Sequence, residues 1–139
     1  MKKTLSLLVF VLVINVLNAQ SRNPKYEAYI EKYSEFAVQC QNEHHIPASI
    51  TLAQGILESG AGESSLAREC NNHFGIKCGS DWYGRSTRKD DDRPNECFRC
   101  YKSAKESYDD HAKFLQRQRY AFLFDYPITD YKSWAYGLK

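Results

Sequence analysis

Long hydrophobic runs are absent from this sequence except near its start. Residues 5–16 are almost wholly apolar, follow two lysines and precede a small-residue site that ends at Ala19. A bilayer-spanning helix needs about 20 apolar residues, so this run is too short for a membrane anchor and predicts a signal peptide over residues 1–19. The residue directly after Ala19 is Gln20 and not Cys, so no lipid anchor is indicated. Residues 20–139 are expected to form one domain, exported to the periplasm or the extracellular space.

The sequence also lacks a large excess of positive or negative charge. The chain has 19 Lys and Arg against 17 Asp and Glu, and two of the lysines lie in the predicted signal peptide. The remaining domain is formally neutral and has no basic stripe, which disfavours nucleic acid as a partner. The Gly-x-Ser-x-Gly elbow of the α/β-hydrolases and the phosphate-binding loop are also missing, and no motif predicts a cofactor.

The apolar residues that are present recur mostly at helical spacing. Helices are predicted over residues 25–41, 48–59, 64–69 and 103–118, followed by a last helix that Thr129 caps. The helix after Ser103 begins with a capping box completed by Glu106. Short β-type runs are predicted over residues 74–78, 84–89 and 96–101. The predicted fold class is α+β, a mainly helical domain with a small β-hairpin lobe.

The second predicted helix carries a polar stripe. Its members are Thr51, Gln54, Gly55 and Glu58, which share one face at spacing i, i+3, i+4 and i+7. Such a stripe either faces solvent or lines a cleft. Gly55 favours a cleft, because a glycine inside a helix costs about 1 kcal/mol relative to Ala and a bound chain passing close to the backbone would explain it. The opposite arc, expected to be buried, consists of Ile50, Leu52, Ala53, Ile56 and Leu57.

Glu58 stands at the end of this helix, just before the break at residues 60–62. A carboxyl that apolar neighbours such as Ile56 and Leu57 partly shield can stay protonated near neutral pH and act as a general acid. The alternative is an ordinary solvated glutamate at a helix end.

Three consecutive carboxylates, Asp90, Asp91 and Asp92, stand near the tip of the predicted hairpin. They are open to three interpretations: a solvated turn, a calcium loop, or a second catalytic carboxylate that faces Glu58 across a sugar chain, as in glycoside hydrolases. Calcium is the least favoured, because the Asp-x-Asp-x-Asp-Gly pattern is absent. Aromatic residues of the β-lobe are candidates for a sugar-binding cleft, with core packing as the alternative: Phe74, Trp82, Tyr83 and Tyr101.

The chain has five cysteines. Export permits disulfides, and an odd count leaves at least one thiol unpaired. Cys78 and Cys97 lie on neighbouring β-type runs and are the favoured pair, with Cys40–Cys70 as a second, weaker pair that leaves Cys100 free. No metal site is predicted, because only Cys97 and Cys100 have zinc-like spacing and positions three apart on a strand face opposite sides.

Four segments, taken together, resemble glycoside hydrolase family 73, the peptidoglycan-cleaving endo-β-N-acetylglucosaminidases that include flagellar hydrolases. These segments read SITLAQGILESGAGESSLA, NNHFGIKC, FRCYKS and SWAYGLK. The resemblance covers residues 25–139 and implies a lysozyme-like fold with a sugar-binding groove between a helical lobe and a β-hairpin lobe.

The resemblance also implies roles for individual residues. Glu58 matches the general acid of the family motif Ala-Gln-x-x-x-Glu-Ser-x-x-Gly, which also contains Gln54. Asn72 and Phe74 match a segment beside the groove, and Tyr101 matches the tyrosine of Phe-Arg-x-Tyr. Together with Trp82, these residues are the predicted substrate-binding set: Gln54, Asn72, Phe74, Trp82 and Tyr101.

This chain departs from the family in two places. The family's second carboxylate is usually a hairpin Glu, whereas this hairpin offers Asp90, Asp91 or Asp92, of which Asp91 is the predicted second catalytic residue. In such a family, either this second carboxylate activates the attacking water, or the substrate's own N-acetyl group assists the reaction in its place. In the family a Gly-Tyr-Ala-Thr segment follows the motif that here ends at Lys139, so the C-terminal end of the domain is expected to be missing.

The predicted function is therefore an exported peptidoglycan hydrolase that cleaves β-1,4 glycosidic bonds at N-acetylglucosamine by general acid catalysis. Its predicted partners are peptidoglycan glycan strands. Two alternatives keep the same scaffold. One is a non-catalytic glycan-binding protein, and the other is a lytic transglycosylase, which needs a single acid and no second carboxylate.

Overall fold

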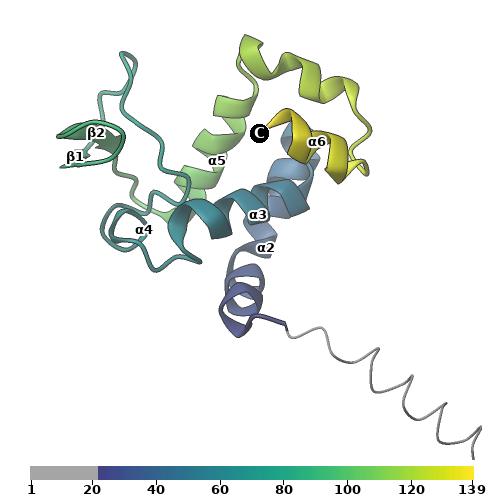
Figure 1. Ribbon diagram of the computed structural model, residues 1–139, viewed down its shortest axis with the longest axis horizontal. Coiled ribbons are helices and arrows are strands. Elements are labelled where there is room, and N and C mark those ends of the chain that lie inside the picture. Colours follow the sequence, from purple (N-terminus) through teal and green to yellow (C-terminus); the bar gives the residue numbers. More distant parts are fainter. Residues whose placement is uncertain (1–21) are drawn as a thin grey trace, which may run out of the picture.

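The computed structural model describes residues 22–139, so the predicted signal peptide lies outside the described residues. The helices are α2 (Pro24–His44), α3 (Ala48–Ser59), α4 (Ser65–Cys70), α5 (Ala104–Leu115), the 3₁₀ helix η1 (Gln118–Asp125) and α6 (Tyr131–Gly137). The strands are β1 (Ser86–Lys89) and β2 (Glu96–Arg99). Figure 1 shows the hairpin and α4 on one side of α3, and α6 on the other. The predicted α+β class, mainly helical with a small hairpin, is confirmed.

Local sequence signals set the helix boundaries. The side chain of Asn23 accepts a hydrogen bond from the Lys25 N–H at 3.0 Å, and Pro24 follows in the first helical position. α2 continues to His44, three residues beyond the predicted end, because His45 provides the left-handed C-cap. At α5 one half of the predicted capping box forms: Ser103 Oγ accepts from the Glu106 N–H at 3.3 Å, whereas the Glu106 carboxylate accepts from the Lys102 N–H at 2.9 Å.

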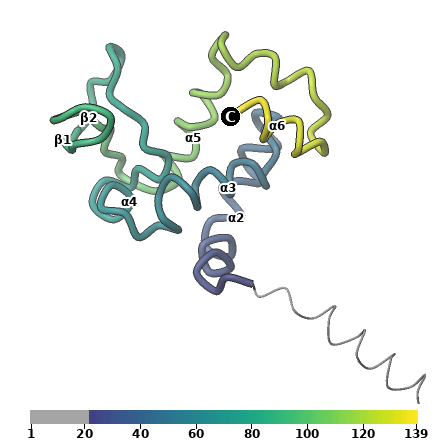
Figure 2. The backbone as a smooth tube through the Cα atoms, in the orientation of Figure 1, coloured from purple at the N-terminus to yellow at the C-terminus, as the bar shows by residue number. Residues whose placement is uncertain are grey.

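The core lies where α2 packs against α3 and α5 (Figure 2). Its buried apolar members are Ala37, Cys40, Ile46, Ile50, Phe74, Ile76, Tyr108, Ala112, Leu115, Leu123 and Trp134. Gly55 is part of this packing, because a Cβ there would lie 2.5 Å from the hydroxyl of Tyr29. The prediction that Gly55 makes room for a bound chain is wrong: it makes room for a tyrosine of the neighbouring helix.

The β-lobe is smaller than the sequence predicted. β1 and β2 pair antiparallel, with Ser86 opposite Arg99, and residues 74–78 contribute only a single bridge, between Lys77 and Phe98. Cys78 pairs with Cys97 as predicted. The second predicted pair is wrong, because Cys70 instead pairs with Cys100, which follows β2 directly in sequence. Cys40 is the free thiol, buried beside the carbonyl of Tyr108.

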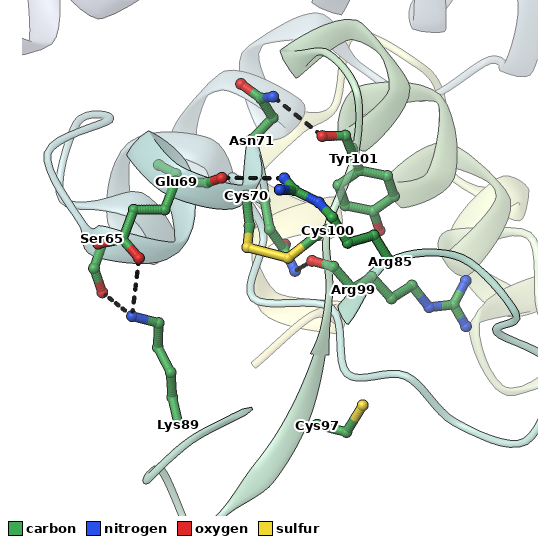
Figure 3. The surroundings of a disulfide bond; sticks show 12 residues. Ser65, Glu69, Cys70, Asn71, Arg85, Lys89, Cys97, Arg99, Cys100 and Tyr101 are labelled. Carbon is green, nitrogen blue, oxygen red and sulfur yellow. Dashed lines mark hydrogen bonds and ion pairs between the residues drawn. A yellow bond between two sulfur atoms is a disulfide. The ribbon is translucent and has the colours of Figure 1, made fainter. Parts of the chain in front are cut away.

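The Cys70–Cys100 disulfide is the centre of a contact between α4 and the hairpin (Figure 3). Around it, the Tyr101 N–H donates to the Cys70 carbonyl at 2.8 Å, and Lys89 donates to Ser65 Oγ at 2.7 Å. An isolated two-stranded hairpin is marginally stable in water, so these links to α4 hold it in place.

The C-terminal part differs from its prediction in three ways. α5 ends at Leu115 and is followed by η1, which the sequence pattern did not indicate. Asp130, not Thr129, caps α6, since its side chain accepts from the Ser133 N–H at 3.1 Å. Within α6, Trp134 is buried.

The sequence of residues 22–139 also bears on membrane insertion. None of the helices in this part of the chain combines the length and the apolar character that a membrane crossing requires.

Candidate active site

A cleft of about 390 Å³, called the main cleft below, runs between α3, the loop after α4, and the end of α5. Its polar lining includes Gln54, Glu58, Lys77, Arg99, His111 and Arg117, and its apolar and aromatic lining includes Phe74, Ile76, Phe114, Leu115, Tyr120 and Leu138. A mixed wall of aromatic faces and convergent polar groups is typical of small-molecule and sugar sites.

A second cleft of about 200 Å³ lies between α3, α4 and the hairpin. Glu58 and Gly75 line both clefts, whereas Asp90 and Asp91 line the second. Glu58 therefore stands where the two clefts meet, and the two predicted catalytic carboxylates, Glu58 and Asp91, share one cleft.

The geometry at Glu58 follows from how α3 ends. Gly60 takes a left-handed conformation with φ of 57°, which stops the helix one turn beyond Gly55 and two residues after Glu58. Across the cleft stands Gly75, with φ of 62°, where an added Cβ would lie 3.8 Å from Glu58 Oε2. The absence of a side chain at Gly75 keeps the approach to the carboxyl open.

The sequence predicted that apolar neighbours would shield Glu58, and this prediction is wrong. Leu57 is 75% exposed and Glu58 is exposed as well. The buried face of α3 carries Thr51, Gly55 and Ser59 instead, because α2 packs against that side. Protein side chains alone thus do not remove the Glu58 carboxyl from water.

Asp91 is held by an ion pair. Lys77 Nζ lies 3.1 Å from Asp91 Oδ2, 3.2 Å from Asp92 Oδ2 and 2.9 Å from Glu96 Oε2. Hydrogen bonds to these carboxylates raise the pKa of Lys77 above its ordinary value. The three carboxylates converge closely enough to hold a cation, and the Lys77 ammonium supplies that positive charge. Asp90 is oriented separately, by the Asn95 N–H at 2.8 Å.

Gln54 and Phe74, both predicted to bind substrate, line the main cleft and meet there through His111. His111 Nε2 lies 3.0 Å from Gln54 Oε1, and its ring stacks on Phe74 with centroids 4.0 Å apart. Burial lowers the pKa of His111 to about 3, so the imidazole is neutral at physiological pH. The sequence prediction missed His111. The available signal was its spacing of three from Tyr108 and four from Leu115, the buried residues of α5.

Asn72, Trp82 and Tyr101 do not line either cleft. Asn72 is buried and uses its amide on the backbone: it donates to the Ile76 and Arg99 carbonyls at 3.0 and 2.9 Å and accepts from the Ile76 N–H at 3.0 Å. Its place in the sequence motif thus coincides with a structural role, the shaping of the turn that presents Phe74 and Gly75.

The two aromatic residues form a separate contact behind the cleft. Tyr101 is buried and its hydroxyl donates to Asp110 Oδ2 at 2.5 Å, while burial raises the pKa of this tyrosine above its ordinary value. Trp82 packs edge-on against Tyr101 and donates to the Arg85 carbonyl at 3.0 Å. Tyr83, the remaining aromatic candidate, is 94% exposed and is absent from both linings.

Comparison with known proteins identifies the family. A sequence profile for glucosaminidases, described as mannosyl-glycoprotein endo-beta-N-acetylglucosaminidase, matches residues 34–139. The chain belongs to this glucosaminidase family. The predicted membership of glycoside hydrolase family 73 is thereby confirmed.

Individual relatives of this glucosaminidase domain agree. Exo-glucosaminidase LytG of Bacillus subtilis (strain 168) is 34% identical over 99 residues, which cover 66% of this chain and 34% of that protein, so the chain spans about a third of its length. A peptidoglycan hydrolase from Sphingomonas sp. A1 is similar in structure, with a TM-score of 0.69 and 27% identity over 80% of this chain and 74% of that one.

The glycoside hydrolase domain of Salmonella typhimurium FlgJ gives a TM-score of 0.68 and 27% identity, over 81% of this chain and 74% of that one. The predicted lysozyme-like fold is confirmed by these neighbours of the glucosaminidase domain.

Proposed function

We propose that this chain is an exported peptidoglycan hydrolase that cleaves β-1,4 glycosidic bonds at N-acetylglucosamine, with Glu58 as the general acid. The observation that carries the proposal is the position of Glu58 at the meeting point of two clefts. Family membership and the similarity to proteins described as peptidoglycan hydrolases support it. The two disulfides of the β-lobe are compatible with an oxidising compartment, the periplasm or the cell exterior.

A glycan strand laid along both clefts would cross Glu58 with sugars on either side. Because Glu58 is exposed in the free protein, the bound strand itself excludes water from the carboxyl. A desolvated carboxyl favours its protonated form and can then donate the proton to the glycosidic oxygen. Gln54, held by His111, and Phe74 offer a polar and an aromatic contact to the sugars in the main cleft.

Asp91 is the proposed second carboxylate. It lines the same cleft as Glu58, and Lys77 forms an ion pair with its carboxylate at 3.1 Å. In an inverting reaction this group activates a water molecule on the face of the sugar opposite the acid. We assign Asn72 and Tyr101 to the support of the site, since both are buried outside the clefts.

The proposal is tested by digestion of purified sacculi followed by analysis of the new reducing ends. We expect N-acetylglucosamine at these ends. We also expect Glu58→Gln to lower the rate at least about 100-fold, because general acid catalysis contributes roughly 10²–10⁴-fold. Glu35→Gln, at an exposed position of α2, is the matched control and should keep the wild-type rate. Full activity of Glu58→Gln, or ends made only of N-acetylmuramic acid, would refute the assignment.

A lytic transglycosylase is the second candidate, favoured by the ion pair that engages Asp91 with Lys77 at 3.1 Å. A transglycosylase needs only the acid, so Asp91→Asn would then retain activity and the products would carry anhydro ends. Under the hydrolase proposal, Asp91→Asn lowers the rate at least about 100-fold and no anhydro sugars form. Binding to sacculi without any product would instead identify a non-catalytic glycan-binding protein.

A further inference from the structure

A side pocket of about 220 Å³ adjoins the main cleft at the end of α5. The two spaces share the wall formed by Ile76, Arg99, Phe114 and Arg117. The rest of the side pocket is charged, with Asp81, Asp110 and Lys113 in its lining. A strand held beside Glu58 would therefore run next to a polar pocket whose lining contains neither Glu58 nor Asp91.

The charge of Arg99 is already balanced. Arg99 is buried and its guanidinium donates to Asp110 Oδ2 at 3.0 Å and to Asp81 Oδ1 at 2.9 Å. The guanidinium also donates to the Lys77 and Cys78 carbonyls, at 3.0 and 3.1 Å, and lies 5.0 Å from the centroid of the Trp82 ring. Arg99 is thus a structural centre that binds two carboxylates and holds the pocket floor, and it has little capacity left for a ligand.

Lys113 and Arg117 are the less fully paired cations of this lining. Lys113 is exposed, and no carboxylate among residues 22–139 lies within ion-pairing distance of its ammonium. Arg117 approaches Asp81 only at 3.8 Å, and its guanidinium lies 4.6 Å from the centroid of the Phe114 ring. Counting Arg99, Asp81 and Asp110 as well, three positive charges face two negative ones in this lining.

We propose that Lys113 and Arg117 form a subsite for a carboxylate attached to the glycan strand. The inference rests on the proposed function and extends it. The sugars of a peptidoglycan strand are uncharged, and their lactyl substituents carry the anionic groups: the carboxylates of the stem peptide or, where the peptide is missing, the free lactyl carboxylate. A guanidinium and an ammonium in the lining of one pocket are suited to such a group, because charge-assisted hydrogen bonds to carboxylates are the strong ones.

A purely structural explanation exists for both side chains. Lys113 lies in the last turn of α5 and Arg117 just after it, where cations interact favourably with the helix dipole. That explanation predicts an effect on stability and none on ligand preference. A binding measurement therefore separates the two.

The experiment measures binding in the Glu58→Gln background, so that cleavage cannot interfere. Three probes of equal length are compared: strands bearing stem peptides, the same strands after an amidase has removed the peptides, and N-acetylglucosamine oligosaccharides, which have no carboxylate. The test variant is Lys113→Gln/Arg117→Gln. The control is Arg68→Gln/Lys132→Gln, which removes two exposed charges that line none of the three pockets.

We expect a carboxylate-bearing strand to bind about tenfold more tightly than the neutral oligosaccharide, and the test variant to abolish this preference while the control keeps it. A preference confined to peptide-bearing strands identifies the stem carboxylate as the ligand, and one confined to stripped strands identifies the lactyl carboxylate. An unchanged preference in the test variant, or an equal loss in the control, overturns the subsite. Cleavage of sacculi by the wild-type chain is measured separately, so failure of the hydrolase proposal is seen independently.

Discussion

At the scale of single residues, α3 passes from the core to the clefts within one helical turn, between Gly55 and Glu58. Gly55 lies against the hydroxyl of Tyr29, which receives a hydrogen bond from Tyr108 at 2.9 Å and lies 3.0 Å from His73 Nδ1. Glu58, three residues later, is exposed at the junction of the clefts. The buried tyrosines thus fix the end of the helix that carries the proposed acid.

Gly55→Ala tests this packing, because the packing predicts a loss of stability where an open helix predicts a gain. In an open helix the change would stabilise by about 1 kcal/mol. Here the new Cβ would meet the Tyr29 hydroxyl at 2.5 Å, so we expect a loss of roughly 1–3 kcal/mol in the free energy of unfolding, measured in urea. Adding Tyr29→Phe should recover part of the loss, which a double-mutant cycle quantifies. A Gly55→Ala protein as stable as wild type would contradict the packing.

Asn72→Ala tests whether this residue supports the site or binds substrate. The change removes the Asn72 partner of the Ile76 N–H and of the Arg99 carbonyl, whereas the Ile76 carbonyl keeps the Arg99 N–H at 3.0 Å. Each buried polar group that loses its partner costs about 1–3 kcal/mol, so we expect a loss of at least about 2 kcal/mol in urea unfolding. Asn42→Ala, at an exposed position of α2, should change stability little. If Asn72→Ala keeps its stability but loses affinity for strands, the residue contacts substrate after all.

At the scale of elements, the hairpin depends on covalent links. Its strands have four residues each, too few to be stable alone. The Cys78–Cys97 bond fixes the loop before β1 to β2, and the Cys70–Cys100 bond fixes α4 to the residue after β2 (Figure 3). Since Asp91 lies between the two strands, these bonds also determine where the proposed second carboxylate stands.

Removal of either bond should be destabilising. Closing chain segments with sequence separations of 19 and 30 residues stabilises by about 3 kcal/mol each in the chain-entropy picture. We expect a loss of that order for Cys78→Ala/Cys97→Ala and for Cys70→Ala/Cys100→Ala, measured by urea unfolding without reductant. Cys40→Ala removes no bridge and is the control.

A thiol titration tests independently which cysteines form the two disulfides. Cys40 is buried and its pKa is raised to about 11, so the native protein should show no reactive thiol and the denatured protein one. Three reactive thiols in the denatured protein would mean that one of the two bonds does not form.

At the scale of the whole molecule, two neutral histidines are enclosed by the fold. Burial lowers the pKa of His73 to about 4 and that of His111 to about 3. In the unfolded chain both titrate near 6.5. Between these values the unfolded state binds more protons than the native state, so stability falls as the pH falls.

We therefore expect the free energy of unfolding to decrease below about pH 6.5 and to keep decreasing towards pH 4. Each histidine contributes a slope of up to about 1.4 kcal/mol per pH unit. Urea unfolding at pH 7, 6 and 5 measures the slope, which His111→Gln should reduce. His45→Gln, at an exposed position, should leave it unchanged. Equal stability at pH 7 and pH 5 would show that the histidines are not held neutral.

The sequence by itself determined the features that arise within a few residues. Apolar spacing placed most helices, and Ser103 set the start of α5 as its N-cap. These signals are local, because helix periodicity and capping involve residues at most four apart.

Only the tertiary structure decided which partners meet across the chain. It joined Cys70 to Cys100, brought His111 to Gln54 and set Lys77 against the hairpin acids. It also turned the face of α3 that carries Gly55 towards α2 and left Glu58 exposed. The physical reason is that burial of a face and the pairing of distant side chains depend on how whole elements pack, which no short stretch of sequence records.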